Sequence, residues 1–301
     1  MVVTGECKLL HTCEMCDSNN ETDCKADQMQ HKRWLVKKRM GDIKHKIIVG
    51  SNKGGVGKST VTTNLAMALA EKGFKVGLAD ADLHGPNIPK LLKAEKVRLK
   101  TVKNGVEPFV TPNGMKVASL GFLIEDPGMH IAWRDAVKYD FIIELLGNIY
   151  WGELDYLLVD LPPGTGNEQI TIIDFIENVD GAIVVTTPQD LALLDARKMI
   201  SFARDSKVPV MGIIENMSSL NCPHCQKEID VFKKGGGEKL AQELGVPYLG
   251  KVPLDPEIVI QSDKGEPVVA SRPKSEAAKA FLRLADNCNS FVDPQKSVKA
   301  S

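Results

Sequence analysis

The chain has 301 residues, of which 43% are hydrophobic and 26% charged, and its formal net charge at pH 7 is -1. Such a length and hydrophobic share are typical of one large α/β domain with short appendages. The nearly neutral charge gives no electrostatic argument for nucleic acid or an anionic membrane as a partner. The sequence contains neither an apolar run of about 18 residues nor a secretory signal. We therefore expect a cytoplasmic protein with reduced thiols, in which clustered cysteines indicate metal binding.

Four of the seven cysteines lie within the polar residues 1–25, at positions Cys7, Cys13, Cys16 and Cys24. Four thiols in one short segment are enough for a complete [4Fe-4S] cluster or a zinc site. We interpret the segment as an N-terminal metal- or cluster-binding extension; the alternative is a disordered tail with incidental cysteines. Residues 26–45 are basic, and we predict a short linker helix there with solvated charges.

From Lys46 onward, apolar runs alternate with helical patterns. Strands are predicted at 46–51, 75–80, 115–120, 155–161, 181–187, 209–215 and 247–251. Helices are predicted at 60–72, 136–148, 190–205, 236–244 and 275–288. Several strands are continuously apolar, as is typical of a parallel sheet covered on both faces. The pattern predicts a doubly wound, mostly parallel α/β domain over 46–288, followed by a polar tail over 289–301.

A glycine-rich segment separates the first predicted strand from the first predicted helix. It comprises Lys53, Gly54, Gly55, Val56, Gly57, Lys58, Ser59 and Thr60. A strand, a glycine turn and a helix N-terminus form a phosphate cradle, because backbone N–H groups and the helix dipole face the anion. Lys58 is expected to reach the β- and γ-phosphates, and Ser59 to hold Mg²⁺. Asn52 occupies the usual first glycine position, which it tolerates because asparagine adopts left-handed backbone angles.

Three aspartates follow predicted strands. Asp80, Asp82 and Asp160 are expected at the carboxyl edge of the sheet, facing the phosphates. Asp160 is predicted to hold Mg²⁺ through water, and Asp82 to position or deprotonate the attacking water. Each could instead be a helix N-cap. Asn216, after the strand 209–215, offers a donor and an acceptor to a purine edge, although a turn-forming asparagine explains it equally well.

The loop 53–60 resembles the deviant Walker A motif of the MinD/ParA/nitrogenase-iron-protein superfamily of SIMIBI-type P-loop NTPases. Within that superfamily, the segments 80–87, 160–166 and 215–218 resemble the Mrp-type (ApbC-like) iron–sulfur cluster carrier ATPases, and the likeness covers residues 45–285. The resemblance implies a slow, Mg²⁺-dependent ATPase that forms a homodimer with ATP at the subunit interface. It implies that Lys53 reaches the partner's nucleotide, that Asp82 is the switch carboxylate and that Asn216 contacts adenine.

Cys222 and Cys225 form a C-x-x-C pair in a polar loop after Asn216. Two thiolates are too few for a closed four-ligand site, but a symmetric dimer supplies four. Judged by ligand chemistry alone, a zinc ion fits this pair as well as an iron–sulfur cluster does, and His224 offers a further ligand. The resemblance implies a labile [4Fe-4S] cluster bridging the subunits. The N-terminal cysteines resemble the extension of the family's eukaryotic cytosolic branch, which carries a second cluster. Cys288 is expected to be a small buried hydrophobe.

We therefore predict a homodimeric, ATP-hydrolysing carrier or scaffold that binds [4Fe-4S] clusters and transfers them to apo-proteins, without nucleic acid or membrane as a partner. One alternative is a spatial-organising ATPase like MinD or ParA. That alternative lacks a basic amphipathic tail and leaves Cys222 and Cys225 unexplained. A second alternative is a zinc-stabilised nucleotide switch without cluster chemistry.

Overall fold

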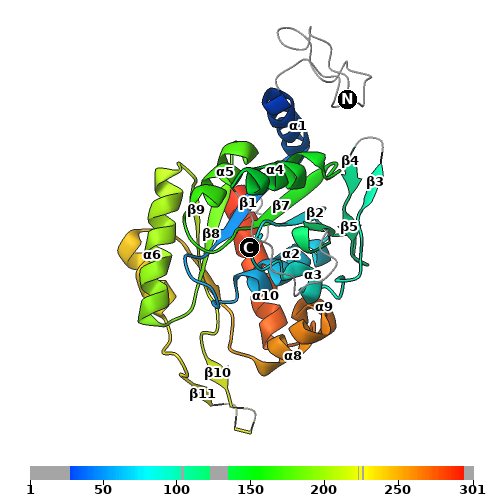
Figure 1. Ribbon diagram of the computed structural model, residues 1–301. Coiled ribbons are helices and arrows are strands. Elements are labelled where there is room, and N and C mark those ends of the chain that lie inside the picture. Colours follow the sequence, from blue (N-terminus) through cyan, green and yellow to red (C-terminus); the bar gives the residue numbers. More distant parts are fainter. Residues whose placement is uncertain (1–27, 103–104, 123–134, 223, 226, 295–301) are drawn as a thin grey trace.

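The computed structural model describes residues 28–102, 105–122, 135–222, 224–225 and 227–294 (Figure 1). An eight-stranded sheet lies at its centre, in the order β12-β9-β8-β1-β7-β2-β6-β5. Its strands are β1 (Ile43–Gly50), β2 (Val76–Asp80), β5 (Phe109–Val110), β6 (Lys116–Ser119), β7 (Leu154–Asp160), β8 (Gly181–Thr186), β9 (Val210–Glu215) and β12 (Tyr248–Lys251). All neighbouring pairs are parallel except β5 and β6. The predicted doubly wound, mostly parallel fold is thereby confirmed.

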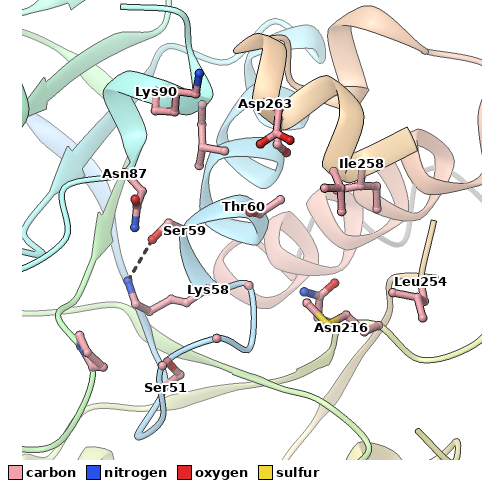
Figure 2. Close-up of a pocket in the computed structure, with 18 of the residues that line it drawn as sticks. Ser51, Lys58, Ser59, Thr60, Asn87, Lys90, Asn216, Leu254, Ile258 and Asp263 are labelled. Atoms are coloured by element: carbon pink, nitrogen blue, oxygen red, sulfur yellow. Dashed lines mark hydrogen bonds between the residues drawn. The ribbon is translucent and has the colours of Figure 1, made fainter. Parts of the chain in front are cut away.

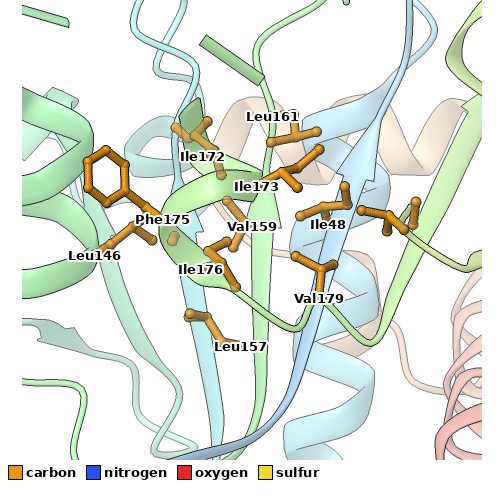
Figure 3. Close-up of a cluster of buried hydrophobic side chains, with 14 of the residues drawn as sticks. Ile48, Leu146, Leu157, Val159, Leu161, Ile172, Ile173, Phe175, Ile176 and Val179 are labelled. Carbon is orange, nitrogen blue, oxygen red and sulfur yellow. The ribbon is translucent and has the colours of Figure 1, made fainter. Parts of the chain in front are cut away.

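Helices cover both faces of this sheet because its strands are apolar on both sides. In β1, the side chain of Ile48 belongs to one hydrophobic cluster, whereas Ile47 and Val49 belong to the other. The first cluster packs under α1 (Gln28–Gly41), α4 (Asp135–Ile143), α5 (Asn167–Ile176), α6 (Asp190–Asp205) and α7 (Gly236–Leu244), and Figure 3 shows its part beneath α5. The second packs under α2 (Lys58–Glu71), α9 (Val268–Ser271) and α10 (Glu276–Val292).

The N-terminal helix is more than a solvated linker. Val36 and Met40 of α1 are buried in the first cluster, and the buried guanidinium of Arg39 donates to the carbonyl oxygen of Gly147 at 3.3 Å. Its basic residues Lys37 and Lys38 remain exposed, as expected. The apolar positions of the stretch therefore dock α1 on the domain.

Several boundaries differ from the predictions. The first strand begins at Ile43, inside the stretch predicted as a linker, because Ile43 already pairs with Leu154 of β7. The helix predicted at 136–148 ends at Ile143 and continues as a π-helical turn, Glu144–Asn148. The last helix extends to Val292, beyond the expected end at 288, because its apolar face is still packed there.

Short elements without strong periodicity were not predicted. They are strand β5, the hairpin of β3 (Lys100–Val102) and β4 (Gly105–Glu107), the helices α3 (Ile88–Leu91), α8 (Pro256–Lys264) and α9, and the 3-10 turn Leu120–Phe122. The longer helix α5 was not predicted either. A second hairpin, of β10 (Leu220–Asn221) and β11 (Glu228–Ile229), projects from the body of the molecule (Figure 1). We call residues 220–229 the cysteine hairpin, because the C-x-x-C pair lies at its turn. None of the helices in the described part of the chain combines the length and apolar composition needed to cross a membrane.

Candidate functional site: a nucleotide cleft and a cysteine hairpin

A cleft of about 470 Å³ opens at the carboxyl edge of the sheet, where ligands bind in open α/β folds (Figure 2). Such a volume is within the range of pockets that hold nucleotide-sized ligands. Its lining combines the glycine-rich loop with segments distant in sequence: Ser51, Lys53, Gly54, Gly55, Gly57, Lys58, Ser59, Thr60, Asp82, Asn87, Pro163, Asn216, Met217, Leu254, Asp255 and Ile258, among others.

The glycine-rich loop leaves the N-terminus of α2 open to an anion. Gly57 precedes the helix with a φ of 78°, in the left-handed region, and no side chain caps the first turn. A β-carbon at Gly57 would overlap Nδ2 of the buried Asn216, so both the backbone angle and that side chain disfavour a larger residue there. The first N–H groups of α2 therefore face the cleft without an internal partner, as a phosphate site requires.

Asp160, at the end of β7, is the centre of a buried polar network. Its Oδ2 accepts from Lys58 Nζ at 2.7 Å and from Ser59 Oγ at 2.6 Å. Its Oδ1 accepts from Thr62 Oγ1 at 2.7 Å. The carboxylate and hydroxyl oxygens of Asp160 and Ser59 are hard ligands of the kind Mg²⁺ prefers, so the donor set fits that ion. Thr62 was not predicted; its only sequence signal is a polar residue one turn after Ser59.

Asp80 and Asp82 have different surroundings. Asp82 lines the cleft, with Oδ2 3.9 Å from Lys58 Nζ, and its Oδ1 accepts backbone N–H groups of His84 and Gly85. Burial raises the pKa of Asp82, and Lys58 opposes that rise. Asp80, which was expected to face the phosphates, is not among the residues that line the cleft. It accepts from Ser119 Oγ at 2.7 Å, and burial, with the charge of Asp160 next, raises the pKa of Asp80 to about 8.

Lys53 lines the cleft at its outer edge and is half exposed. The residue before it is fixed to α6, because Asn52 Nδ2 donates to Asp195 Oδ1 at 3.0 Å. Asn216 is buried and donates from Nδ2 to the carbonyl oxygen of Val56 at 2.9 Å. The asparagine predicted to read a base is thus also bonded to the phosphate loop.

Cys222 and Cys225 lie at the turn of the cysteine hairpin, where Cys222 N–H donates to the carbonyl oxygen of Lys227 at 2.9 Å. Hydrogen bonds from the backbone of Cys225 and then of His224, followed by one from the Cys225 side chain, lower the pKa of the Cys222 thiol. A thiolate held by N–H donors is prepared to bind a metal. Among the described residues, no three His, Cys, Asp or Glu side chains are grouped to hold a metal ion, so the pair has no further ligand there.

The other cysteines have different places. Cys288 is fully buried in the second hydrophobic cluster, and burial raises the pKa of its thiol to about 12. It is therefore the small buried hydrophobe that was expected. Cys7, Cys13, Cys16 and Cys24 lie outside the described residues, so their predicted ligand role stays a prediction.

The wall of the cleft opposite α2 was missed by sequence reasoning. Leu254, Asp255 and Ile258, at and before the start of α8, line it. They carry no phosphate or base motif, and no local pattern brings a segment near residue 255 to a loop near residue 55. Their position follows from β12, which places the chain beside β9 at the same edge of the sheet.

Comparison with known proteins agrees with this geometry. The ParA family, described as NUBPL iron-transfer P-loop NTPase, matches residues 42–289. The iron–sulfur cluster carrier protein of Methanocaldococcus jannaschii is 48% identical over 284 residues, or 94% of this chain and 97% of its own. The cytosolic Fe-S cluster assembly factor CFD1 of Eremothecium gossypii is 43% identical over 82% of this chain and 92% of its own.

The solved structures include a nucleotide-binding protein of Archaeoglobus fulgidus in complex with ADP. It has a TM-score of 0.71 and 37% identity, and the match covers 83% of this chain and 96% of that one. The region that the family model matches, residues 42–289, includes the glycine-rich loop, the strand ends and the cysteine hairpin. This chain belongs to the ParA family of iron-transfer P-loop NTPases, the family in which its relatives are iron–sulfur cluster carriers.

Proposed function

We propose that the chain is a homodimeric, Mg²⁺-dependent ATPase that carries a [4Fe-4S] cluster as cargo and passes it to apo-proteins. The observation that carries this proposal is the pair Cys222 and Cys225. The pair stands on a hairpin that projects from the body of the molecule, and it supplies two thiolates per chain. Ser219, just before this hairpin, is bonded to Leu254 of the cleft wall. A four-iron cluster takes four thiolates, so two chains related by a two-fold axis complete the set.

In the nucleotide cleft, each residue of the buried network has a proposed role. The N–H groups at the start of α2 and the ammonium of Lys58 bind the phosphates. Ser59 and Asp160 hold Mg²⁺, which when bound neutralises charge on the phosphate oxygens. Asp82, beside Lys58, orients the attacking water. Lys53, which lines the cleft and is half-buried, reaches the nucleotide of the partner subunit, and turnover is slow.

The relatives support the nucleotide and the cargo separately. The Archaeoglobus fulgidus protein binds ADP, and the curated relatives are named as iron–sulfur cluster carriers or assembly factors. Asn216, which lines the cleft, is proposed to contact adenine. A cytoplasmic location is proposed by analogy with the Eremothecium gossypii relative, which is named as cytosolic.

The test is anaerobic reconstitution with iron and sulfide in wild type and in the double variant Cys222→Ala/Cys225→Ala, with Cys288→Ala as the matched control. Residues 1–25 are deleted in all three proteins, so that only this site is measured. We expect about four iron atoms per dimer in the wild type and in Cys288→Ala, and none in the double variant. Full iron content in the double variant would contradict the proposal. Zinc in the anaerobically purified protein, with no iron uptake, would favour the zinc-stabilised switch instead.

A second cluster on Cys7, Cys13, Cys16 and Cys24 is proposed from the number of these cysteines and from their resemblance to the extension of the family's cytosolic branch. Deleting residues 1–25 should lower the iron content by about four atoms per chain. An unchanged iron content after the deletion would remove the N-terminal site and leave the hairpin site intact.

A further inference from the structure

Glu215 is the last residue of β9, directly before Asn216, and its side chain is completely buried. A carboxylate is rarely buried in this way unless its oxygens are paired. None of the roles assigned to the nucleotide cleft requires it, because Asn216 and not Glu215 lines that cleft. The hydrogen-bond partners of Glu215 therefore indicate its role.

Within the described part of the chain, three groups donate to Glu215, and they come from segments before and after the cysteine hairpin. Oε1 accepts from Ser218 Oγ at 2.5 Å, just before β10. Oε1 also accepts the N–H of Gly235 at 3.2 Å, and Oε2 accepts the N–H of Gly237 at 2.6 Å; both amides belong to the N-terminus of α7, the helix that follows β11. One carboxylate thus ties Ser218, just before the hairpin, and the N-terminus of α7, which follows it, to the end of β9, and we call these two segments the flanks of the hairpin.

The two residues that follow Glu215 in the chain line the nucleotide cleft. Asn216 is bonded to the phosphate loop at Val56, and Met217, which also lines the cleft, has a left-handed φ of 54°. That conformation is unfavourable for a side-chain-bearing residue and is found where surrounding contacts enforce it. The N–H of Leu254, another lining residue, donates to the carbonyl oxygen of Ser219 at 2.8 Å. The cleft wall and the start of the hairpin are therefore one hydrogen-bonded unit.

We propose that Glu215 is a positioning residue that couples nucleotide occupancy in the cleft to the arrangement of the Cys222 and Cys225 thiols. A nucleotide that shifts Asn216 or Met217 moves the end of β9, and the carboxylate transmits this shift to both flanks of the hairpin. The proposal rests on the proposed function only for the identity of the cargo. The coupling is between nucleotide in the cleft and the Cys222 and Cys225 thiols, so it can be measured in protein that holds no cluster.

The experiment measures alkylation of Cys222 and Cys225 by iodoacetamide in metal-free protein, residue by residue by mass spectrometry, with and without Mg·ADP. In the wild type, ADP should change the alkylation rates by about fivefold, the lower end of typical coupling between two sites. In Glu215→Ala, the change in alkylation rate caused by ADP should fall below about twofold. The affinity of this variant for ADP should stay within about threefold of the wild-type value, because only the coupling is lost. Glu215→Gln, which keeps one acceptor oxygen, should give an intermediate response.

The matched control is Glu238→Ala, an exposed carboxylate on α7 close to the same segment, which should behave as wild type. Hydrogen exchange at the Gly237 amide should be about tenfold faster in Glu215→Ala, because that amide loses a charge-assisted acceptor. If Glu215→Ala does not fold, Ser218→Ala removes one donor alone and should weaken the thiol response.

Three results would overturn the proposal. One is a wild type whose thiols do not respond to ADP. Another is a full response in Glu215→Ala, and the last is a full response in both Glu215→Gln and Ser218→Ala. A chain that fails to bind iron and sulfide would refute the proposed function but leave this measurement decisive.

Discussion

In the nucleotide cleft, Lys58 and Asp160 are buried and bonded to each other, whereas at the turn of the cysteine hairpin Cys225 and His224 are exposed. The first region draws its groups from β1, α2, β7 and α8 of one chain. The second presents two thiols on a two-stranded ribbon. The difference indicates that the residues of the nucleotide cleft are already in contact within a single chain, whereas the hairpin presents only two of the four thiolates that the proposed cluster takes. Substitutions in the cleft should therefore affect the folded chain itself, and substitutions at the hairpin only its chemistry.

The largest effect is expected at Lys58. Lys58→Ala removes the ammonium that contacts Asp160 and is placed to reach the phosphates, so ATP hydrolysis should fall by at least about 100-fold. Phosphate release measured with purified protein checks this. Lys72→Ala, at the other end of the same helix and paired with Asp286 on the surface, is the control and should keep full activity. A Lys58→Ala protein with near-normal turnover would refute the assigned role.

The next largest effect, on stability and ADP binding, is expected at Gly57, and Gly54 of the same loop is its control. Gly57→Ala should destabilise the fold by about 1–3 kcal/mol and weaken ADP binding about tenfold, because its left-handed backbone and the Asn216 amide leave no room for a methyl group. At Gly54 a β-carbon meets no atom within 4 Å, so Gly54→Ala should change stability by less than about 0.5 kcal/mol. Urea unfolding and ADP titration test both. Equal losses for the two variants would show that the conformation at Gly57 does not matter.

A pH-dependent effect is expected from Asp80, whose pKa is raised from 3.8 to about 8 in the folded chain, first by burial and then by the charge of Asp160. The folded state keeps a proton that the unfolded state has lost, so this contribution to stability is full below about pH 4 and is lost as the pH rises through about 8. Relative to Asp80→Asn, the nucleotide-free wild type should lose up to about 1.4 kcal/mol per pH unit between pH 5 and 7. Urea unfolding of both proteins at several pH values measures this; parallel pH profiles would contradict it.

The smallest effect is confined to the hairpin. Because backbone N–H groups of Cys225 and His224 stabilise the Cys222 thiolate, half-maximal alkylation of Cys222 should occur at a lower pH than in an unstructured peptide of the same sequence. The unfolding free energy of Cys222→Ala should differ from that of the wild type by less than about 0.5 kcal/mol, since the hairpin turn lies outside both hydrophobic clusters. Coincident alkylation profiles for protein and peptide would show that the turn does not prepare the thiol.

The sequence alone predicted the parallel sheet, the glycine-rich loop, the strand-end aspartates and the C-x-x-C pair. These features are local: the loop is eight consecutive residues, and a buried parallel strand is a run of apolar residues. Short elements such as α3, with four residues, and β10, with two, were missed because so few residues carry little periodic signal. The end of α10 was misplaced because packing of its last turn, and not polarity, determines where it ends.

Only the tertiary structure decided which of these residues meet. Asp160 reaches Lys58 across 102 positions because β1 and β7 are neighbours, and the pairing of β2 with β6 places Asp80 beside Ser119. Glu215 looked like part of a strand, yet its oxygens join segments on either side of the cysteine hairpin. Residue type and spacing determine what chemistry a side chain can perform, whereas strand order and register determine its partner, because contacts between distant segments leave no periodic trace in the chain.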